Sequence, residues 1–249
     1  MSKIILYHGS DHRIEAPSYD KGKETNDYGK GFYCTAEIEM AKEWASRGKK
    51  NGFVNTYELD TDGLEVLDLQ QENYTVLNWI AILLKHRTFN TQNEIAEDAR
   101  KYVIDHFGID IDKYDIVIGY RADDSYFAFA QSFINNTLPL RSLAKAMMLG
   151  KLGIQIALVS KKAFEHLKYV SSEEINSNTY NTKYMDRDQE ARETYRNEIK
   201  KSKSYKDDIF VMDIIREEIE NDDLRVQRFI FKWRPNISRS INRLFNKRL

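Results

Sequence analysis

The chain has very few of the residues that build disulfide frameworks and metal clusters. Its 249 residues include 1 cysteine and 5 histidines. A single cysteine excludes an internal disulfide and a cysteine-based metal cluster. The scattered histidines show no pairing at the spacing of metal ligands. We therefore expect a protein that works without a metal ion.

The sequence also lacks long apolar runs and a dominant charge. No stretch approaches the ~20 apolar residues of a membrane-spanning helix, and the first apolar run is too short for a signal peptide. We therefore expect no membrane partner and a cytoplasmic location. The 38 basic and 39 acidic residues nearly cancel, which argues against wholesale nucleic-acid binding and leaves local charged patches open.

Two short motifs stand near the start of the chain. Tyr7-His8-Gly9-Ser10 ends a strand-like run, and the segment from Asp27 to Thr35 reads Asp-Tyr-Gly-Lys-Gly-Phe-Tyr-Cys-Thr. In this order and at this separation, the pair resembles the NAD-binding core of the ADP-ribosyltransferase superfamily. The resemblance is to the branch that includes diphtheria toxin and the poly-ADP-ribose polymerases, whose signature is His, Tyr and a third, usually acidic, residue.

The resemblance implies a role for each motif residue. His8 would hydrogen-bond a ribose hydroxyl, and the backbone of Gly9 would pair with the nicotinamide carboxamide because no Cβ blocks the approach. Tyr33 would stack on the nicotinamide ring. On the next helix, Trp44 stands where polymerase-like members carry a tyrosine, and Ala41 replaces a serine that contacts nicotinamide. The cofactor-binding residues implied are His8, Gly9, Ser10, Tyr33, Ala41 and Trp44.

The third signature residue departs from the usual pattern. The matching position, at the start of a predicted strand, is Gln155. Glutamine can hydrogen-bond a ribose hydroxyl but cannot act as a base, so the chain is a His-Tyr-Gln variant, like small bacterial members of the superfamily. Asp123 or Asp124 is the alternative third residue, in a substrate loop. The catalytic residues expected are therefore His8, Tyr33 and Gln155.

Taken one at a time, these residues also fit ordinary structural roles. A His-Gly-Ser segment is typical of a strand that enters a turn, and Tyr33 and Trp44 could be core packing. Their co-occurrence favours the NAD site. Cys34 would point to the opposite face of the strand from Tyr33, and we interpret it as a small buried hydrophobic residue.

The resemblance implies an enzyme that cleaves NAD without a metal and transfers one ADP-ribose to an acceptor. The acceptor, a protein or a nucleic acid, is not determined by the sequence. A bacterial toxin of a toxin–antitoxin pair or of phage defence fits this activity. Two alternatives use the same site: an NAD glycohydrolase, with water as acceptor, and a catalytically inactive NAD-binding module.

The apolar pattern predicts an α+β fold. Short alternating or β-branched runs predict strands, and apolar residues three or four positions apart predict helices. The predicted strands are residues 4–8, 31–35, 53–59, 64–69, 115–120 and 153–160. The predicted helices are residues 36–47, 74–87, 93–107, 126–135 and 141–149. The resemblance implies a split, mainly antiparallel sheet with flanking helices and a cleft between its halves.

The resemblance covers about residues 4–170, so we expect an NAD-binding domain over residues 1–170 and a helical extension over residues 171–249. Residues 188–203 and 207–220 read as helices. From Leu224 to Leu249, basic residues are mixed with aromatic ones and no acidic residue occurs. This tail could pack its aromatic residues on the core, contact RNA or DNA, or bind an acidic partner such as an antitoxin.

Overall fold

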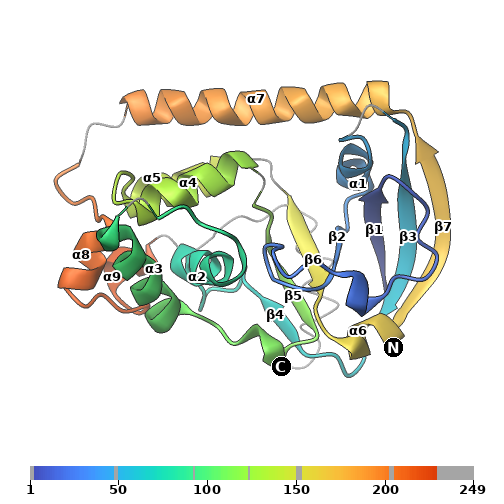
Figure 1. Ribbon diagram of the computed structural model, residues 1–249, viewed down its shortest axis with the longest axis horizontal. Helices are drawn as coiled ribbons and strands as arrows, with labels where there is room; N and C mark the ends of the chain where they lie inside the picture. The colour runs from blue at the N-terminus through green and yellow to red at the C-terminus, as the bar shows by residue number, and fades with distance from the viewer. Residues whose placement is uncertain are drawn as a thin grey trace.

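The computed structural model describes residues 3–47, 50–91, 93–122, 124–149, 153–201 and 205–228, which form two β-sheets flanked by helices (Figure 1). The first sheet has the order β1-β3-β7, with strands β1 (Lys3–Ser10), β3 (Gly52–Asp60) and β7 (Leu167–Ile175). The second has the order β2-β6-β5-β4, with strands β2 (Phe32–Cys34), β6 (Ile154–Leu158), β5 (Ile116–Tyr120) and β4 (Val66–Asp68). The predicted α+β class is confirmed.

The burial of the strands follows their apolar pattern. In the described part of the chain, neighbouring strands are antiparallel except β4 and β5, which run parallel. Every residue of β5 is buried, as its continuous apolar run predicts for a strand covered on both faces. In β1, Ile4 and Leu6 are buried while Ile5 is exposed, because alternate residues of a strand point to opposite faces.

The two sheets meet where β1 passes β2. Tyr7 and Thr35 form an isolated antiparallel pair in which each N–H donates to the other residue's carbonyl oxygen, with N···O distances of 2.8 and 2.9 Å. Otherwise β1 pairs with β3, and β2 pairs with β6. His8 directly follows this pair, so it lies at the point where the two sheets separate.

The helices predicted before residue 150 are all present, with ends shifted by one or a few residues. They are α1 (Ile38–Ala45), α2 (Val76–His86), α3 (Glu94–Phe107), α4 (Asp124–Ile134) and α5 (Leu140–Leu149). α2 is apolar on nearly all sides and belongs to the larger hydrophobic core, as expected for a helix without a polar face. α3 begins after Asn93, whose side chain accepts a hydrogen bond from the Ala96 N–H at 2.9 Å, a typical N-cap.

The chain beyond residue 160 differs from the prediction. After the short helix α6 (Lys161–Glu165), β7 forms at the edge of the first sheet, where no strand was predicted. Most of its residues are polar and at least partly exposed, so the alternation of apolar residues that marks a strand is weak. α7 (Ser177–Lys201) begins well before residue 188, and α8 (Val211–Arg216) is shorter than the predicted helix 207–220.

The C-terminal helices pack on the rest of the protein. α7 contacts α1 near one end and α4 and α5 farther along, as its course across Figure 1 shows. Val211 and Ile214 of α8 and Val226 of α9 (Leu224–Gln227) are buried in the same core as α2. Residues 229–249, which hold most of the basic tail, lie outside the described residues. The possible roles of that tail therefore stay predictions.

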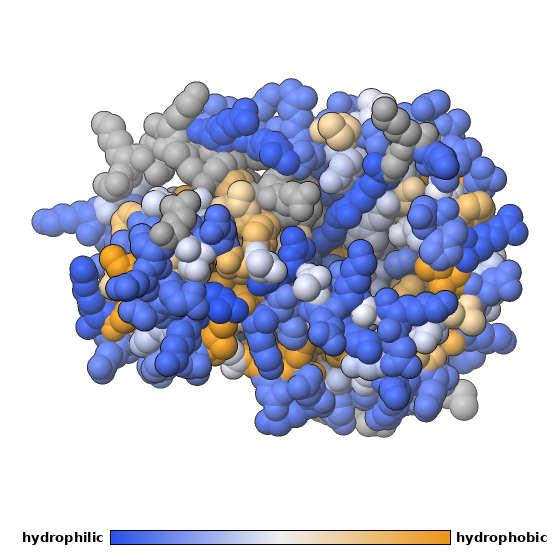
Figure 2. All heavy atoms as spheres, in the orientation of Figure 1, coloured by the Kyte–Doolittle hydropathy of each residue, from blue (hydrophilic) through white to orange (hydrophobic). Residues whose placement is uncertain are grey.

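The surface is mainly hydrophilic on the face that Figure 2 shows, with hydrophobic residues in small groups. The exposed large hydrophobic side chains of the described residues belong to separate elements: Ile5, Ile95, Val170, Met185, Tyr205 and Leu224. No helix within the described ranges has both the length and the apolarity needed to cross a membrane.

One buried side chain in β3 holds the segment that follows β1. Asn55 is fully buried, and both ends of its amide group are used. Its oxygen accepts hydrogen bonds from the Ile14 N–H at 2.9 Å and the Ser172 hydroxyl at 2.6 Å. Its nitrogen donates to the Ser10 hydroxyl at 3.0 Å and to the carbonyls of His8 and His12. Asn55 therefore fixes the path of residues 8–14.

We expect Asn55→Ala to lower the free energy of unfolding by on the order of 2–3 kcal/mol, because it leaves several buried donors and acceptors unsatisfied. Chemical denaturation with far-UV circular dichroism measures this loss. The control is Asn178→Ala, the same change at an exposed position at the start of α7, which should shift the free energy by a few tenths of a kcal/mol. Equal effects of the two changes would contradict the role of Asn55.

Candidate functional site

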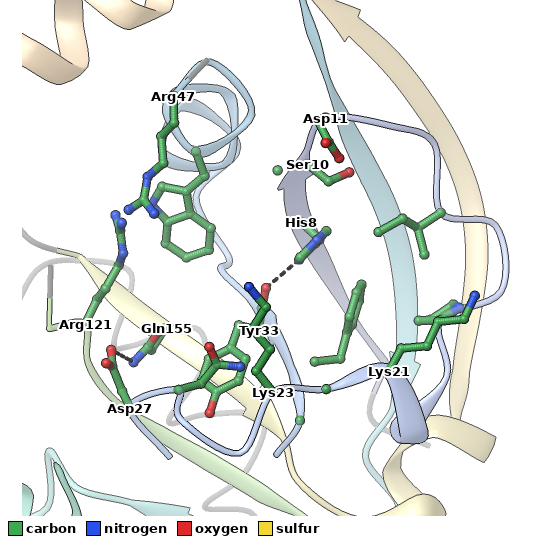
Figure 3. A pocket seen from close by; sticks show the side chains of 18 of the residues that line it. His8, Ser10, Asp11, Lys21, Lys23, Asp27, Tyr33, Arg47, Arg121 and Gln155 are labelled. Carbon is green, nitrogen blue, oxygen red and sulfur yellow. Dashed lines mark hydrogen bonds between the residues drawn. The ribbon is translucent and has the colours of Figure 1, made fainter. Parts of the chain in front are cut away.

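A cavity of about 800 Å³ lies where the two sheets separate (Figure 3). Its walls come from β1, the loop 11–31, β2, α1, the ends of β5 and β6, and α7. The volume is in the range of small-molecule sites. His8, Tyr33 and Gln155, the expected catalytic residues, all line this cavity. The fold thus brings together three side chains that are far apart in the sequence.

Strand register explains why Tyr33 and Gln155 face the same space. Tyr33 lies opposite Ala157 in the antiparallel pairing of β2 with β6. Gln155 is two residues from Ala157 on β6, and side chains two residues apart in a strand point to the same face. The two side chains therefore share the cavity face of the second sheet.

His8 is held as a neutral ring in a fixed orientation. Its Nδ1 lies 2.7 Å from the Tyr33 carbonyl oxygen. Because a carbonyl only accepts hydrogen bonds, Nδ1 carries the proton, and Nε2 of the neutral ring is an acceptor. The ring stacks on Phe32, with centroids 4.3 Å apart. Burial lowers the pKa of His8 below its ordinary value, and the hydrogen bond to Tyr33 opposes this shift.

The hydroxyl of Tyr33 is used within the protein. It donates to the Gly29 carbonyl at 2.6 Å and accepts from the Tyr28 N–H at 3.0 Å. Burial raises the pKa of Tyr33, so the hydroxyl stays neutral. The flat face of the ring is therefore the part that a ligand can contact. Cys34 is buried, and burial raises the pKa of its thiol, which confirms that it is a buried hydrophobic residue.

Gln155 is buried and its amide nitrogen has two partners. Nε2 donates to Asp27 Oδ2 at 2.9 Å and to the Tyr120 carbonyl oxygen at 3.2 Å. Since both partners are acceptors, the nitrogen rather than the oxygen must face them. Of the alternative third residues, Asp123 lies outside the described residues. Asp124 begins α4, and its side chain also lies outside what the structure describes.

Asp27 is a cavity residue that sequence analysis did not predict as part of the site. It is 6% exposed and accepts hydrogen bonds from Arg87 Nη1, the Ala122 N–H and Gln155 Nε2, each at 2.9 Å. Burial raises the pKa of the Asp27 carboxyl, while these three donors oppose the rise. In the sequence, Asp27 stands directly before the Tyr-Gly-Lys-Gly segment. An aspartate at such a place is equally typical of a turn.

The other expected cofactor-binding residues do not all reach the cavity. Gly9, Ser10 and Trp44 line it, whereas Ala41 is not among the described lining residues and packs in a small separate core. The structure shows a packing reason for glycine at position 9. A Cβ there would lie 2.1 Å from the Ala41 carbonyl oxygen and 2.9 Å from Trp44 Cβ. Gly9 therefore lets α1 pack closely on β1, which brings Trp44 to the cavity.

The cavity is basic although the chain is nearly neutral. Five basic and two acidic side chains line it, and Asp27 is already paired with one of the basic ones. Such a lining favours an anionic ligand. The sequence did not reveal it, because the basic residues come from separate segments: Lys21, Lys23, Arg47, Arg87 and Arg121. In the portion of the chain that the structure describes, no group of three or more His, Cys, Asp or Glu residues could hold a metal ion.

We expect Gln155→Glu to destabilise the protein at pH 7, by on the order of 2 kcal/mol. The change replaces a donor with a second buried carboxylate beside Asp27, and two adjacent carboxylates cannot easily both ionise. The pair then has a folded-state pKa above the ~4 of an unfolded acid. The stability of the variant is therefore retained below pH ~4 and is lost as the pH rises through the raised pKa of the pair. Thermal unfolding between pH 4 and 8 measures this dependence.

The matched control is the double variant Asp27→Asn/Gln155→Glu, which returns one carboxylate and one amide to the pair. It should be more stable at pH 7 than Gln155→Glu alone, although Arg87 then faces a neutral amide oxygen in place of a carboxylate. If the single variant matches the wild-type protein at every pH, the hydrogen bond between Gln155 and Asp27 does not shape this site.

His8 should titrate below the ~6.5 of an unperturbed histidine, because burial favours the neutral ring. Its folded pKa is lowered, so its contribution to stability is present above pH ~6.5 and lost as the pH falls through the folded pKa. An NMR titration of the histidine ring protons measures this value, and His8→Asn assigns the signal while keeping a side-chain donor. A His8 signal that titrates at or above pH 6.5 would contradict the neutral, Nδ1-protonated ring.

Comparisons with known proteins place the chain in a family without giving it a function. No curated protein and no solved structure matches the chain. A family model described as "Protein of unknown function (DUF3990)" matches residues 4–169, which is more than half of the chain. This match runs from β1 to the start of β7 and includes all three expected catalytic residues. The chain belongs to this family.

Proposed function

We propose that the protein binds NAD in the cavity between the two sheets and transfers ADP-ribose from it to an acceptor. One observation carries the proposal: His8, Tyr33 and Gln155, which match a His-Tyr-Gln signature in sequence, lie on three different strands and line one cavity. The two antiparallel-rich sheets that meet between β1 and β2 support an ADP-ribosyltransferase-like fold.

The lining of the cavity fits the chemical parts of NAD. The unprotonated Nε2 of His8 is an acceptor for a ribose hydroxyl. The ring of Tyr33, fixed through its hydroxyl, provides a flat surface for nicotinamide. The excess of basic side chains suits the negatively charged pyrophosphate. His8 and Tyr33 are each held by hydrogen bonds within the protein, so little ordering of these two side chains is needed on binding.

Cleavage of the bond between nicotinamide and ribose develops positive charge on the ribose, and a nearby negative charge stabilises that transition state. Residue 155 carries no charge, but its amide nitrogen holds the carboxylate of Asp27 at 2.9 Å. In this proposal Asp27 supplies the negative charge of the cavity wall, and Gln155 is a positioning residue. Because Arg87 partly neutralises Asp27, cleavage is expected to be slow.

The acceptor then attacks the ribose carbon that nicotinamide leaves, and its lost proton passes to water or to a cavity base. A macromolecular acceptor makes the protein a mono-ADP-ribosyltransferase, and a toxin role with an antitoxin partner follows from that activity. Water as acceptor makes it an NAD glycohydrolase. If NAD binds but stays intact, the protein is a binding module. That outcome would agree with the hydrogen bond between Gln155 and Asp27, which already engages both side chains.

Incubation of the purified protein with NAD labelled in its adenylate part, in the presence of cell lysate, separates these outcomes. Release of free nicotinamide shows cleavage, and label on protein or nucleic acid after separation shows transfer. Cleavage without labelled macromolecule would identify a glycohydrolase. Absence of both cleavage and NAD binding at millimolar concentration would overturn the proposal.

We expect His8→Ala to lower kcat/KM for nicotinamide release by about tenfold or more, because it removes a hydrogen bond and an oriented ring from the cavity. His166→Ala is the matched control: His166 Nδ1 also lies near a backbone carbonyl, that of Asp60, at 3.0 Å, but His166 is not among the described residues that line the cavity. Similar losses in both variants would point to a structural effect.

We expect Asp27→Asn to lower kcat for nicotinamide release by a larger factor than it changes KM, because the charge of Asp27 acts on the transition state.

A further inference from the structure

Two buried hydrogen-bond donors at one side of the cavity have no partner among the residues that the structure describes. They are Nη1 of Arg121 and Nε1 of Trp44. Arg121 is 7% exposed, so its guanidinium is a charge largely removed from water. An unsatisfied buried donor is costly, and a charged one especially so. The pair therefore indicates a place where an acceptor belongs.

The two donors lie together and both residues line the cavity. The Arg121 guanidinium lies over the Trp44 ring, with its central carbon 5.0 Å from the ring centroid. This contact holds the guanidinium plane in place. Arg47 approaches the same region in Figure 3 and stacks on Tyr184 of α7, 5.5 Å from that ring centroid. Two arginines and an indole N–H thus face one part of the cavity.

This cluster is separate from the other basic groups of the cavity. Figure 3 shows Arg47 and Arg121 on one side of His8 and Lys21 on the other, with Lys23 near Tyr33 between them. Arg87 is paired with Asp27. The part of the cavity near Trp44 therefore has its own positive charge.

We propose that Arg121, Trp44 and Arg47 form a phosphate-binding subsite. A phosphate carries up to two negative charges and several acceptor oxygens, so it can satisfy both unpartnered donors and the charge of a second arginine at once. A guanidinium held in one plane is suited to paired hydrogen bonds with phosphate oxygens. If the proposed function holds, that phosphate comes either from the pyrophosphate of NAD or from the acceptor. The subsite itself does not depend on that function.

Binding of inorganic pyrophosphate, measured by calorimetry on the full chain, tests the subsite. The wild-type protein should bind pyrophosphate, and Arg121→Met should weaken that binding by about tenfold or more, because it removes a charged donor while keeping an apolar stem over Trp44. Arg121→Lys should weaken it by a smaller factor. Trp44→Phe removes the indole donor, leaves a smaller ring under Arg121, and should weaken pyrophosphate binding severalfold. Arg121→Lys and Trp44→Phe decide the question if Arg121→Met does not fold.

Arg13→Met is the matched control. Arg13 also stacks on an aromatic ring, that of Phe53 at 5.3 Å, but is exposed and not among the described residues that line the cavity. It should leave pyrophosphate binding nearly unchanged. Equal binding by wild type and the folded Arg121 and Trp44 variants, no binding by the wild type at millimolar concentration, or an equal loss in Arg13→Met would each overturn the subsite.

Competition with NAD identifies the source of the phosphate. If NAD displaces pyrophosphate and Arg121→Met weakens both ligands alike, the subsite holds the pyrophosphate of NAD. If pyrophosphate still binds in an Arg121-dependent way to protein saturated with NAD, the subsite holds a phosphate of the acceptor. Nicotinamide release is measured separately. Arg121-dependent pyrophosphate binding without nicotinamide release would support the subsite and contradict the proposed function. Nicotinamide release without Arg121-dependent pyrophosphate binding would contradict the subsite alone.

Discussion

The structure of the cavity wall depends on one buried carboxylate, that of Asp27. A buried charge is stable only when several groups satisfy it, and here the donors come from three separate parts of the chain. Arg87 lies just after α2, the Ala122 N–H follows β5, and Gln155 belongs to β6. Because all three donors point at one group, the loop before β2 has a defined position against the second sheet. Tyr33 follows Asp27 by only a few residues, so the position of this loop also fixes where the Tyr33 ring lies.

This carboxylate also explains why position 155 carries an amide. The residue there meets two acceptors, Asp27 Oδ2 and the Tyr120 carbonyl oxygen. The same carbonyl also accepts from the Tyr28 hydroxyl and from Trp79 Nε1, so it is fixed in place by the core. Only a donor at position 155 fits between these groups. The amide at position 155 thus has a physical cause within the chain, namely the carboxylate of Asp27 on the loop before β2.

The sequence predicted the elements whose pattern depends on their own residues. β5 is a continuous apolar run, α2 is apolar on nearly all sides, and Asn93 marks the start of α3 by its capping side chain. β7 escaped prediction because an edge strand with polar, exposed residues has little apolar alternation. His8, Tyr33 and Gln155 could be predicted from motifs to approach one another. Asp27 and Arg121 could not be assigned to the site, because their roles arise from partners that only the fold brings near.

The cavity is also completed by a part of the chain that the family match does not include. That match ends at residue 169, within β7, yet Tyr184 of α7 lines the cavity beside Arg47 and Trp44. α7 is fastened to α1 near this point, since Arg187 pairs with Glu43 at 2.7 Å. The region between His8 and Gln155 is therefore built from residues that the family model covers, whereas the side next to Trp44 needs the C-terminal helix. Sequence changes in α7 can therefore alter the lining beside Trp44 and Arg47 without changing His8, Tyr33 or Gln155.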